Sequence, residues 1–259
     1  MAEVERNPIL IYQMGKVGSR TVQSSLRPIL AAQQAMYHLH QLHDLDAVER
    51  AYERAEHVSD AQRDYLETGR VVRKRFDARE PYQWDVITLV RDPVRRNLSA
   101  FFYGLADEAP GVFEQFCAGR MDHAPLLSRF LHSFDHDFAR DWFERQFQPV
   151  FGAELCTQAF SSAGGYQIVE TERVRLLLLR TEDLDRCLAP ALQAFLGFAG
   201  LEPKSENRAT DKAYAAGYRE FLDRVVIPDQ YLSWMYDARW VRQCYTPQEL
   251  ESFRRHWTK

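Results

Sequence analysis

The hydrophobic pattern of the first 30 residues predicts a strand, a glycine turn and a helix, in that order. An apolar run that starts at Ile9 has the length of a strand and ends in a Gly-Lys-x-Gly-Ser turn at residues 15–19. After the turn, apolar residues recur at helical spacing at Val22, Leu26 and Ile29. We interpret this order as an anion cradle, because loop amides and a helix N-terminus offer N–H groups to a phosphate or sulfate.

The rest of the chain alternates between short apolar runs and long stretches with helical character. Four further strands are predicted, at residues 35–40, 84–90, 165–170 and 175–180. Helices are predicted at residues 45–75, from Pro93 onward, in the aromatic-rich stretch 104–151, at residues 184–198 and in the C-terminal part. We expect Gly200 to end the helix at 184–198, and the aromatic stripe from Phe130 to Phe143 to face the core.

Strands separated by long helical crossovers predict an α/β fold, in which helices cover both faces of a central parallel sheet and additional helices follow at the C-terminus. Ligands of such folds bind at the carboxyl ends of the strands. The turn at residues 15–21, His40 and Arg91 each follow a predicted strand. We therefore expect three segments that are distant in sequence to meet in one crevice.

Composition limits the number of domains and the classes of protein that fit this fold. No Pro/Gly/Ser-rich linker divides the 259 residues, so we expect a single domain at 1–259. The net charge of −4 gives no support to a nucleic-acid-binding protein. The basic residues between Arg70 and Arg96 indicate a local surface for an anionic ligand, and for those at 70–79 a solvated helix face is an equal alternative. Four dispersed cysteines and the lack of a signal core or a membrane-length apolar run favour a cytoplasmic protein without a membrane span.

The glycine turn differs from the common nucleoside-triphosphate loop, Gly-x-x-x-x-Gly-Lys-Ser/Thr. In that loop the lysine follows the last glycine and the next hydroxyl holds magnesium. Here Lys16 precedes Gly18. The turn still cradles an anion, but its hydroxyls do not stand where a nucleoside triphosphatase needs them.

Two motifs resemble those of sulfotransferases that use 3′-phosphoadenosine 5′-phosphosulfate (PAPS). Residues 16–21, Lys-Val-Gly-Ser-Arg-Thr, are similar to the loop that grips the 5′-phosphosulfate in that family, with Ser19 where threonine is usual. Residues 91–99 begin with Arg-Asp-Pro and end with Ser99, and they resemble the segment whose arginine and serine bind the 3′-phosphate. The two motifs occur in the family's order, each after a predicted strand.

The resemblance implies a P-loop-like three-layer α/β/α fold, PAPS as the cofactor, 3′-phosphoadenosine 5′-phosphate (PAP) as the product, and no required metal. It gives Lys16 a catalytic role. The residues that it implies for cofactor binding are Gly15, Lys16, Val17, Gly18, Ser19, Arg20, Thr21, Arg91 and Ser99.

Weaker similarities lie toward the C-terminus. Residues 179–184 resemble the family's Arg-Tyr-Glu-Asp-Leu segment, with Thr181 in place of the aromatic residue. Residues 207–257 resemble a subgroup described as capsular polysaccharide synthesis proteins, through Asn207, Lys212, Tyr214, Tyr218, Tyr245 and Trp257. By this resemblance Lys212 closes over the cofactor; the alternative is a plain surface lysine.

Transfer of a sulfuryl group to a hydroxyl needs a base, and histidine has a suitable pKa. On a strand His38 and His40 point to the same side, and this His-x-His segment resembles that of the glycosaminoglycan 2-O-sulfotransferases, where histidine is the base. We expect His40 or His38 to be the base, with His43 and Arg75 as substrate contacts. His-x-His can also bind a metal, as in a zinc or iron hydrolase with His43 or Asp44 as a third ligand, but that reading leaves residues 91–99 unexplained.

With this resemblance, the sequence predicts an enzyme that transfers a sulfuryl group from PAPS to a hydroxyl of a small-molecule or carbohydrate acceptor, and we favour a carbohydrate or polysaccharide. Two other classes stay open. One is a P-loop kinase that acts on a small molecule, and the other is a non-catalytic module that binds PAP or a polysaccharide.

Overall fold

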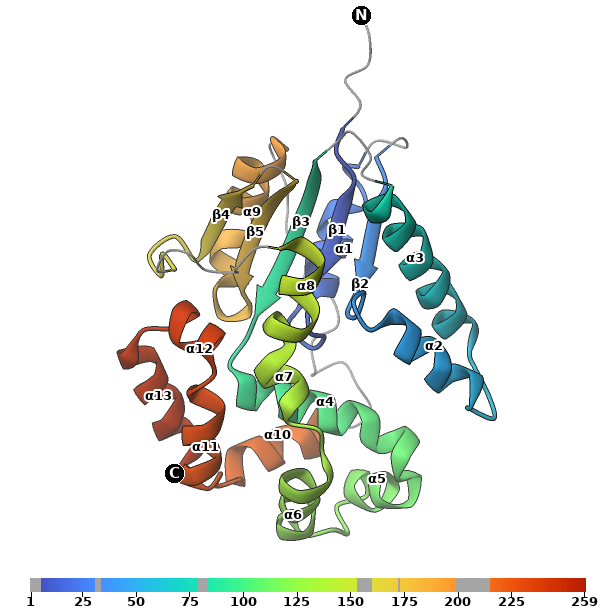
Figure 1. Cartoon of the computed structure of the whole chain (residues 1–259). Coiled ribbons are helices and arrows are strands. Elements are labelled where there is room, and N and C mark those ends of the chain that lie inside the picture. The colour runs from blue at the N-terminus through green and yellow to red at the C-terminus, as the bar shows by residue number, and fades with distance from the viewer. Residues whose placement is uncertain (1–5, 31–33, 79–82, 153–159, 172, 199–214) are drawn as a thin grey trace, which may run out of the picture.

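A five-stranded sheet forms the centre of the molecule (Figure 1). The computed structural model describes residues 6–30, 34–78, 83–152, 160–171, 173–198 and 215–259. Its strands are β1 (Ile9–Tyr12), β2 (Met36–Leu39), β3 (Trp84–Val90), β4 (Tyr166–Glu170) and β5 (Val174–Arg180). They lie in the order β2-β1-β3-β5-β4. Every residue of β1 and β3 is buried, which explains why both strands appear in the sequence as nearly continuous apolar runs.

The sheet is parallel except at one edge. Strand β1 pairs in parallel with β2 and β3, and β3 pairs in parallel with β5, whereas β4 pairs antiparallel with β5. The predicted central parallel sheet is therefore confirmed for four strands, and β4 is the antiparallel exception. Only residues 171–173 separate β4 from β5, and a parallel crossover needs a dozen residues or more, so the two strands form a hairpin.

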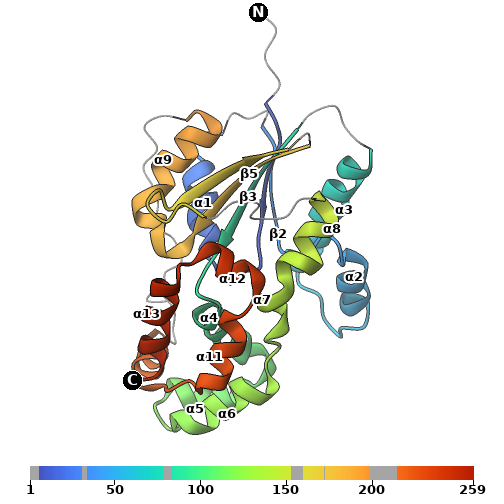
Figure 2. The ribbon, with the colours of Figure 1, turned by 60° about the vertical axis from the view of Figure 1, so that its left-hand side comes forward.

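Helices cover both faces of the sheet, as Figures 1 and 2 show. Helices α1 (Ser19–Leu26) and α9 (Leu184–Leu196) lie on one face. The opposite face is covered by α3 (Asp60–Asp77), α7 (Asp137–Trp142) and α8 (Gln148–Phe151), and a single π-helical turn (Phe143–Phe147) joins α7 to α8. The predicted three-layer α/β/α architecture is thus confirmed.

A second group of helices lies beyond the carboxyl ends of the parallel strands, and we call it the helical cap (Figures 1 and 2). Its members are α4 (Pro93–Glu108), α5 (Pro110–Cys117), α6 (His123–Ser133), α10 (Ala215–Arg224), α11 (Asp229–Tyr236), α12 (Arg239–Cys244) and α13 (Pro247–Trp257). Helix α4 begins at Pro93, directly after β3, as predicted. None of the helices in the described part of the chain has the length and apolar character that a membrane crossing requires.

Two predicted helix boundaries are wrong. The stretch 45–75 forms two helices, α2 (Leu45–Glu53) and α3, because Ser59 and Gln62 form a capping box that starts α3. Helix α9 ends at Leu196, where Gly197 adopts a left-handed conformation with φ of 76°. Gly200, the predicted end, lies outside the described residues.

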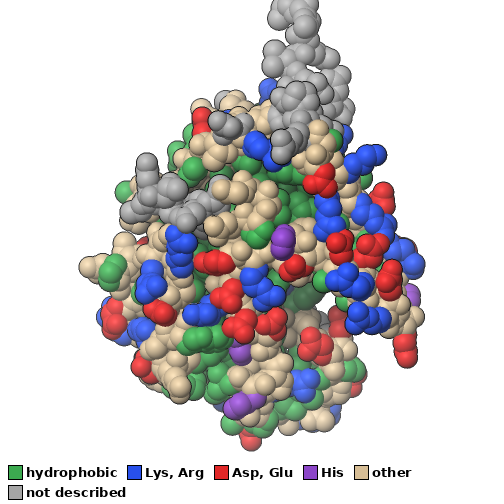
Figure 3. Space-filling view, in the orientation of Figure 1, with side chains coloured by type: hydrophobic (Ala, Val, Ile, Leu, Met, Phe, Trp, Pro, Cys, Tyr) green, Lys and Arg blue, Asp and Glu red, His purple; other side chains and the backbone are tan. Residues whose placement is uncertain are grey.

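The basic stretch 70–79 lies on α3, where ion pairs with neighbouring acids partly neutralise it. Arg70 pairs with Glu49 of α2 and Arg73 pairs with Asp46 of the same helix. Figure 3 shows Lys and Arg side chains mixed with Asp and Glu over these two helices, at the right of the view. The guanidinium of Arg75 lies 5.8 Å from the ring centroid of Tyr37. These contacts favour the interpretation of a solvated helix face.

Candidate active site

A cavity of about 830 Å³ opens at the carboxyl ends of the parallel strands, between the sheet and the helical cap. Gly15, Lys16 and residues 18–21 line it from the turn after β1, which we call the anion loop (residues 15–21). His38 and His40 line it from the end of β2, and Arg91 and Ser99 from the end of β3 and from α4. The three segments that the sequence predicted to meet do line one cavity.

The anion loop has an unusual backbone. Gly15, Lys16 and Gly18 have φ angles of 77°, 62° and 83°, and Lys16 is the one non-glycine residue with positive φ in the described part of the chain. Left-handed residues in such a turn direct main-chain N–H groups toward a common point and so form an anion-binding nest. Helix α1 begins immediately afterward, with no side-chain cap and no acidic residue in its first turn. An anion at this point interacts favourably with the helix dipole.

Side chains from other elements hold the main-chain oxygens of the loop. Arg91 Nη1 donates to Lys16 O at 3.0 Å. Arg96 donates through Nη2 to Met14 O at 2.6 Å and through Nε to Gly15 O at 3.2 Å. Thr181 Oγ1 donates to Val17 O at 2.6 Å. Each carbonyl from residue 14 to residue 17 therefore accepts a hydrogen bond from a side chain, and the loop conformation is fixed before any ligand arrives.

Arg96 is a residue that the sequence reasoning missed. Its guanidinium is buried, lies 5.1 Å from the ring centroid of Phe138 and also donates to Asn97 Oδ1 at 2.9 Å. Burial lowers the pKa of Arg96 to about 10, so the side chain still carries a positive charge at neutral pH. The signal in the sequence was present, since Arg95 and Arg96 follow Arg91, but the sequence does not show which arginine turns inward.

The two histidines lie side by side, as the strand periodicity predicted. Their ring centroids are 5.0 Å apart. Burial, together with the positive charge of Arg20, lowers the pKa of His38 to about 3 and that of His40 to about 4. Both imidazoles are therefore neutral at physiological pH.

Two aromatic residues, from the face of the sheet that α3 and α7 cover, hold the backbone around His40. Trp142 Nε1 donates to His40 O at 2.7 Å, and Tyr65 Oη accepts from His40 N at 3.2 Å and from Gln41 N at 2.8 Å. These bonds fix the position of the ring.

Contacts with Gln13 bear on which nitrogen of His40 carries the proton. His40 Nδ1 lies 3.0 Å from Gln13 O and 2.9 Å from Gln13 Nε2. A carbonyl oxygen only accepts, so the tautomer with its proton on Nδ1 makes the first bond and leaves Nε2 unprotonated, and the amide then directs its protons to other acceptors. A Cβ built on Gly15 would lie 4.0 Å from His40 Nε2, so the unprotonated nitrogen faces the anion loop. This arrangement is suited to accepting a proton from a ligand in the cavity.

Other predicted site residues lie elsewhere. Val17 belongs to the anion loop, but its side chain is buried and does not line the cavity. His43 and Arg75 do not line the cavity; His43 is exposed, because the chain turns after β2 and its alternation ends. Lys212 lies outside the described residues.

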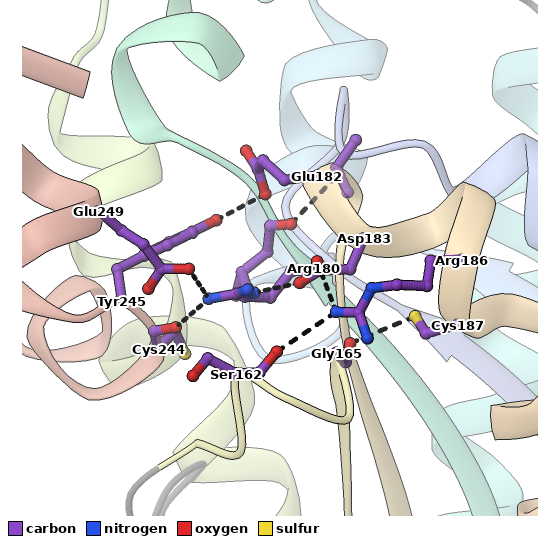
Figure 4. Close-up of polar contacts among 12 residues, drawn as sticks. Ser162, Gly165, Arg180, Glu182, Asp183, Arg186, Cys187, Cys244, Tyr245 and Glu249 are labelled. Carbon is purple, nitrogen blue, oxygen red and sulfur yellow. Dashed lines mark hydrogen bonds and ion pairs between the residues drawn. The ribbon is translucent and has the colours of Figure 1, made fainter. Parts of the chain in front are cut away.

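Residues 180–183 make polar contacts with several elements around the site, and Figure 4 shows those of Arg180, Glu182 and Asp183. Thr181 lines the cavity, and its Oγ1 lies 3.0 Å from Val90 O in addition to its bond with Val17. Glu182 accepts hydrogen bonds from Asp92 N at 2.8 Å and from Tyr245 Oη at 2.9 Å. Arg180 pairs with Asp183 and with Glu249 of α13. The segment thus joins the anion loop, the end of β3 and the helical cap.

Asp92, directly after β3, is fully engaged within the helical cap. Its Oδ1 accepts from Val94 N at 3.1 Å and Tyr236 Oη at 3.2 Å, and its Oδ2 accepts from Trp257 Nε1 at 2.9 Å. Asp92 is buried and does not line the cavity. Within the described residues, no group of three or more His, Cys, Asp or Glu side chains is arranged to hold a metal ion.

One comparison with known proteins gives a match. A family model described as "Putative capsular polysaccharide synthesis protein" matches residues 126–246, which is slightly less than half of the 259 residues. This agrees in part with the resemblance predicted from Tyr218 and Tyr245, which fall within the match. The anion loop, the two histidines and residues 91–99 lie outside it. Searches of curated proteins and of solved structures give no match.

Proposed function

We propose that this chain is a sulfotransferase that moves a sulfuryl group from PAPS to a hydroxyl of an acceptor, with a neutral histidine as the base and two anion sites for the donor. The observation that carries the proposal is the lining of one cavity by the anion loop, by Arg91 and Ser99, and by His40 with its unprotonated Nε2. PAPS carries anionic groups at two ends, so it needs two separate anion sites that face the same space.

The charge of the cavity supports an anionic ligand. Among the described residues, its lining contains the four cations Lys16, Arg20, Arg91 and Arg96, and a single carboxylate, that of Asp185. Its volume of about 830 Å³ is in the range of cavities that bind ligands of nucleotide size. The loop backbone and the uncapped start of α1 suit the 5′-phosphosulfate, and Arg91 with Ser99 suit the 3′-phosphate.

PAPS supplies an activated sulfuryl group on a phosphate oxygen. His40 Nε2 accepts the proton of the acceptor hydroxyl while the hydroxyl oxygen forms a bond to sulfur. The bond between sulfur and the phosphate oxygen breaks, and its electron pair stays on that oxygen. Lys16 and the loop N–H groups stabilise the resulting negative charge, and the hydroxyls of Ser19 and Thr21 hold the group in place.

We assign the base to His40 and not to His38 because their hydrogen bonds differ. His38 Nε2 lies 3.0 Å from Gln13 Nε2 and 3.1 Å from Ser19 Oγ, so that nitrogen is already engaged. The Nδ1 of His40 is bound to a carbonyl, and its Nε2 faces the loop. The match over residues 126–246 supports a carbohydrate, and more specifically a polysaccharide, as the acceptor.

A calorimetric titration with PAP tests the cofactor. We expect wild type to bind PAP, and Lys16→Ala and Arg91→Ala each to bind it at least about tenfold more weakly, because each loses a charge-assisted contact. Arg95→Ala is the matched control, since Arg95 lies on the same helix as Ser99 but outside the cavity lining. Failure of wild type to bind PAP would contradict the proposal, and equal affinities of all variants would contradict the site.

Two further measurements separate the alternatives. A small-molecule kinase would be stabilised by ATP with Mg²⁺ and would not respond to PAP. A binding module would bind PAP but transfer no sulfuryl group from labelled PAPS to unsulfated polysaccharides, and its affinity for PAP would not respond to His40→Ala. The hydrogen bonds of Asp92 are evidence against the kinase. Both oxygens of the carboxylate that follows β3 are bound within the helical cap, and neither is available to a ligand in the cavity.

A further inference from the structure

Gln13 lies between the anion loop and the two histidines. It is the residue directly after β1, and its side chain is fully buried although it is polar. A buried amide is costly unless its donors and acceptor are all bound. The hydrogen bonds of the Gln13 side chain therefore indicate its role in the site.

Gln13 binds the anion loop at two points. Its Oε1 accepts a hydrogen bond from Gly15 N, and its Nε2 lies 2.9 Å from Ser19 Oγ. The first contact holds the start of the loop and the second holds the first residue of α1. One side chain thus spans the loop from its first residue to the helix.

The same amide nitrogen faces both histidines. It lies 3.0 Å from His38 Nε2 and 2.9 Å from His40 Nδ1. An amide nitrogen has two protons to donate. In the tautomer in which His40 Nδ1 donates to Gln13 O, that nitrogen cannot also accept from the amide, so the two amide protons go to Ser19 Oγ and His38 Nε2. His38 then holds its proton on Nδ1.

We infer that Gln13 is a positioning residue of the candidate site, whose main chain and side chain together fix the tautomers of His40 and His38 and their placement relative to the anion loop. The catalytic consequence rests on the proposed function, in which His40 is the base. The tautomers themselves are a property of the protein alone.

The inference can be tested by replacing the amide donor of Gln13 with an acceptor. In Gln13→Glu, a carboxylate oxygen would face His38 Nε2, and that nitrogen would need a proton to make a bond. The groups around the two rings are the cations Lys16, Arg20 and Arg96 and the phenol of Tyr65. All three cations oppose protonation of His40, so the new carboxylate is the group that would favour it.

The experiment records histidine side-chain nitrogen NMR spectra of the cofactor-free protein between pH 8 and pH 5.5, together with melting temperatures. Wild type should show both imidazoles neutral, each with its proton on Nδ1. Gln13→Glu should move the proton of His38 to Nε2 and raise the pKa of at least one of the two histidines above the ordinary value of 6.5. His38→Ala and His40→Ala assign the signals.

Gln13→Met keeps the volume and removes the hydrogen bonds. We expect kcat for sulfuryl transfer to fall by about 10- to 100-fold, with KM for the acceptor changed by less than about threefold, because a base that is misplaced affects the transition state more than binding. Gln34→Met is the matched control: Gln34 is also buried, but its Nε2 donates to Asn7 O at the far end of β1.

Unchanged histidine spectra in both Gln13 variants would overturn the inference, as would a lower melting temperature with unchanged spectra and unchanged kcat. Failure of the proposed function looks different. In that case wild type would neither bind PAP nor transfer a sulfuryl group, while the tautomers and their response to Gln13→Glu would remain as described.

Discussion

Gly18 is the residue of the anion loop with the least steric freedom. Its φ of 83° favours glycine, and a Cβ there would lie 2.9 Å from Leu184 Cδ1 and 3.5 Å from Thr181 Cγ2. We expect Gly18→Ala to lose about 1–3 kcal/mol of stability and to bind PAP more weakly, because the positive φ strains the loop and the new Cβ displaces Leu184 beside it. Urea unfolding and the PAP titration measure the two effects.

Gly119 provides the control for Gly18. Its φ is 65°, and a Cβ there would meet nothing within 4 Å. Gly119→Ala should therefore show the cost of the backbone conformation alone, with PAP affinity unchanged. If Gly18→Ala bound PAP as tightly as Gly119→Ala does, the loop would not be the anion site.

The pH dependence of catalysis depends on the pKa of His40. A base works in its unprotonated form, so a pKa lowered to about 4 by burial and nearby cations keeps His40 competent well below pH 6.5. We expect kcat/KM to stay flat as pH falls from 8 to about 5.5. A profile that falls with an apparent pKa near 6.5 would contradict this environment for the base.

Arg20 is a cation whose charge lowers the pKa of both histidines. Arg20→Gln should move the acid limb of the kcat/KM profile to higher pH, whatever it does to the absolute rate. Arg27→Gln, at the far end of α1 and outside the cavity lining, should leave the limb in place. Identical profiles for the two variants would mean that Arg20 does not influence the base.

At the scale of elements, the junction of β3 and α4 depends on the helical cap through Asp92. Trp257→Phe removes the donor to Asp92 Oδ2 while keeping an aromatic ring in the core. The remaining carboxylate is buried and short of a partner, so we expect a loss of about 1.5–3 kcal/mol, as for hydrogen bonds to charged groups. Urea unfolding monitored by circular dichroism measures the loss.

Trp240→Phe is the matched control, because Trp240 is equally buried but donates to the neutral carbonyl oxygens of Ala139 and Arg140. Its cost should be smaller, about 0.5–1.5 kcal/mol. PAP affinity should fall in Trp257→Phe and not in Trp240→Phe, because Arg91 precedes Asp92. If PAP affinity instead fell in Trp240→Phe and not in Trp257→Phe, the junction of β3 and α4 would not support PAP binding.

Much of the fold could be predicted because its strands leave clear signals. Strand β3 was predicted at its observed bounds, since a strand buried on both faces is an unbroken apolar run. The direction of β4 and the break between α2 and α3 were missed because they depend on a short connection and on a capping box within a charged stretch. The contacts of Gln13 had no local signal, because those with His38 and His40 span 25 and 27 residues and depend on how β1 and β2 pair in the sheet. For Arg96 the run of arginines was visible, but the sequence does not show which arginine turns inward.

At the scale of the whole molecule, groups with opposite pKa shifts act on stability as the pH falls. Burial raises the pKa of Asp92 from 3.8 to about 6. The folded state then binds this proton more tightly, so Asp92 contributes stability that is present below pH 3.8 and is lost as the pH rises through 6. His38 and His40 have lowered pKa values, so the unfolded state binds their protons more tightly. Their contribution is present above pH 6.5 and is lost as the pH falls toward 4 and 3.

Because these effects oppose each other, the pH dependence of wild-type stability cannot be divided between Asp92 and the histidines. A double variant separates the two contributions. In His38→Gln/His40→Asn the histidine contribution is absent and that of Asp92 remains. The difference in unfolding free energy between wild type and this variant should shrink by up to about 1.4 kcal/mol per pH unit for each histidine as the pH falls from 6 to 4.5. Urea unfolding at intervals of half a pH unit gives this difference directly. A difference that stayed constant with pH would mean that the imidazoles are not held neutral by their surroundings, and the assignment of His40 as a base poised in its unprotonated form would lose its physical basis.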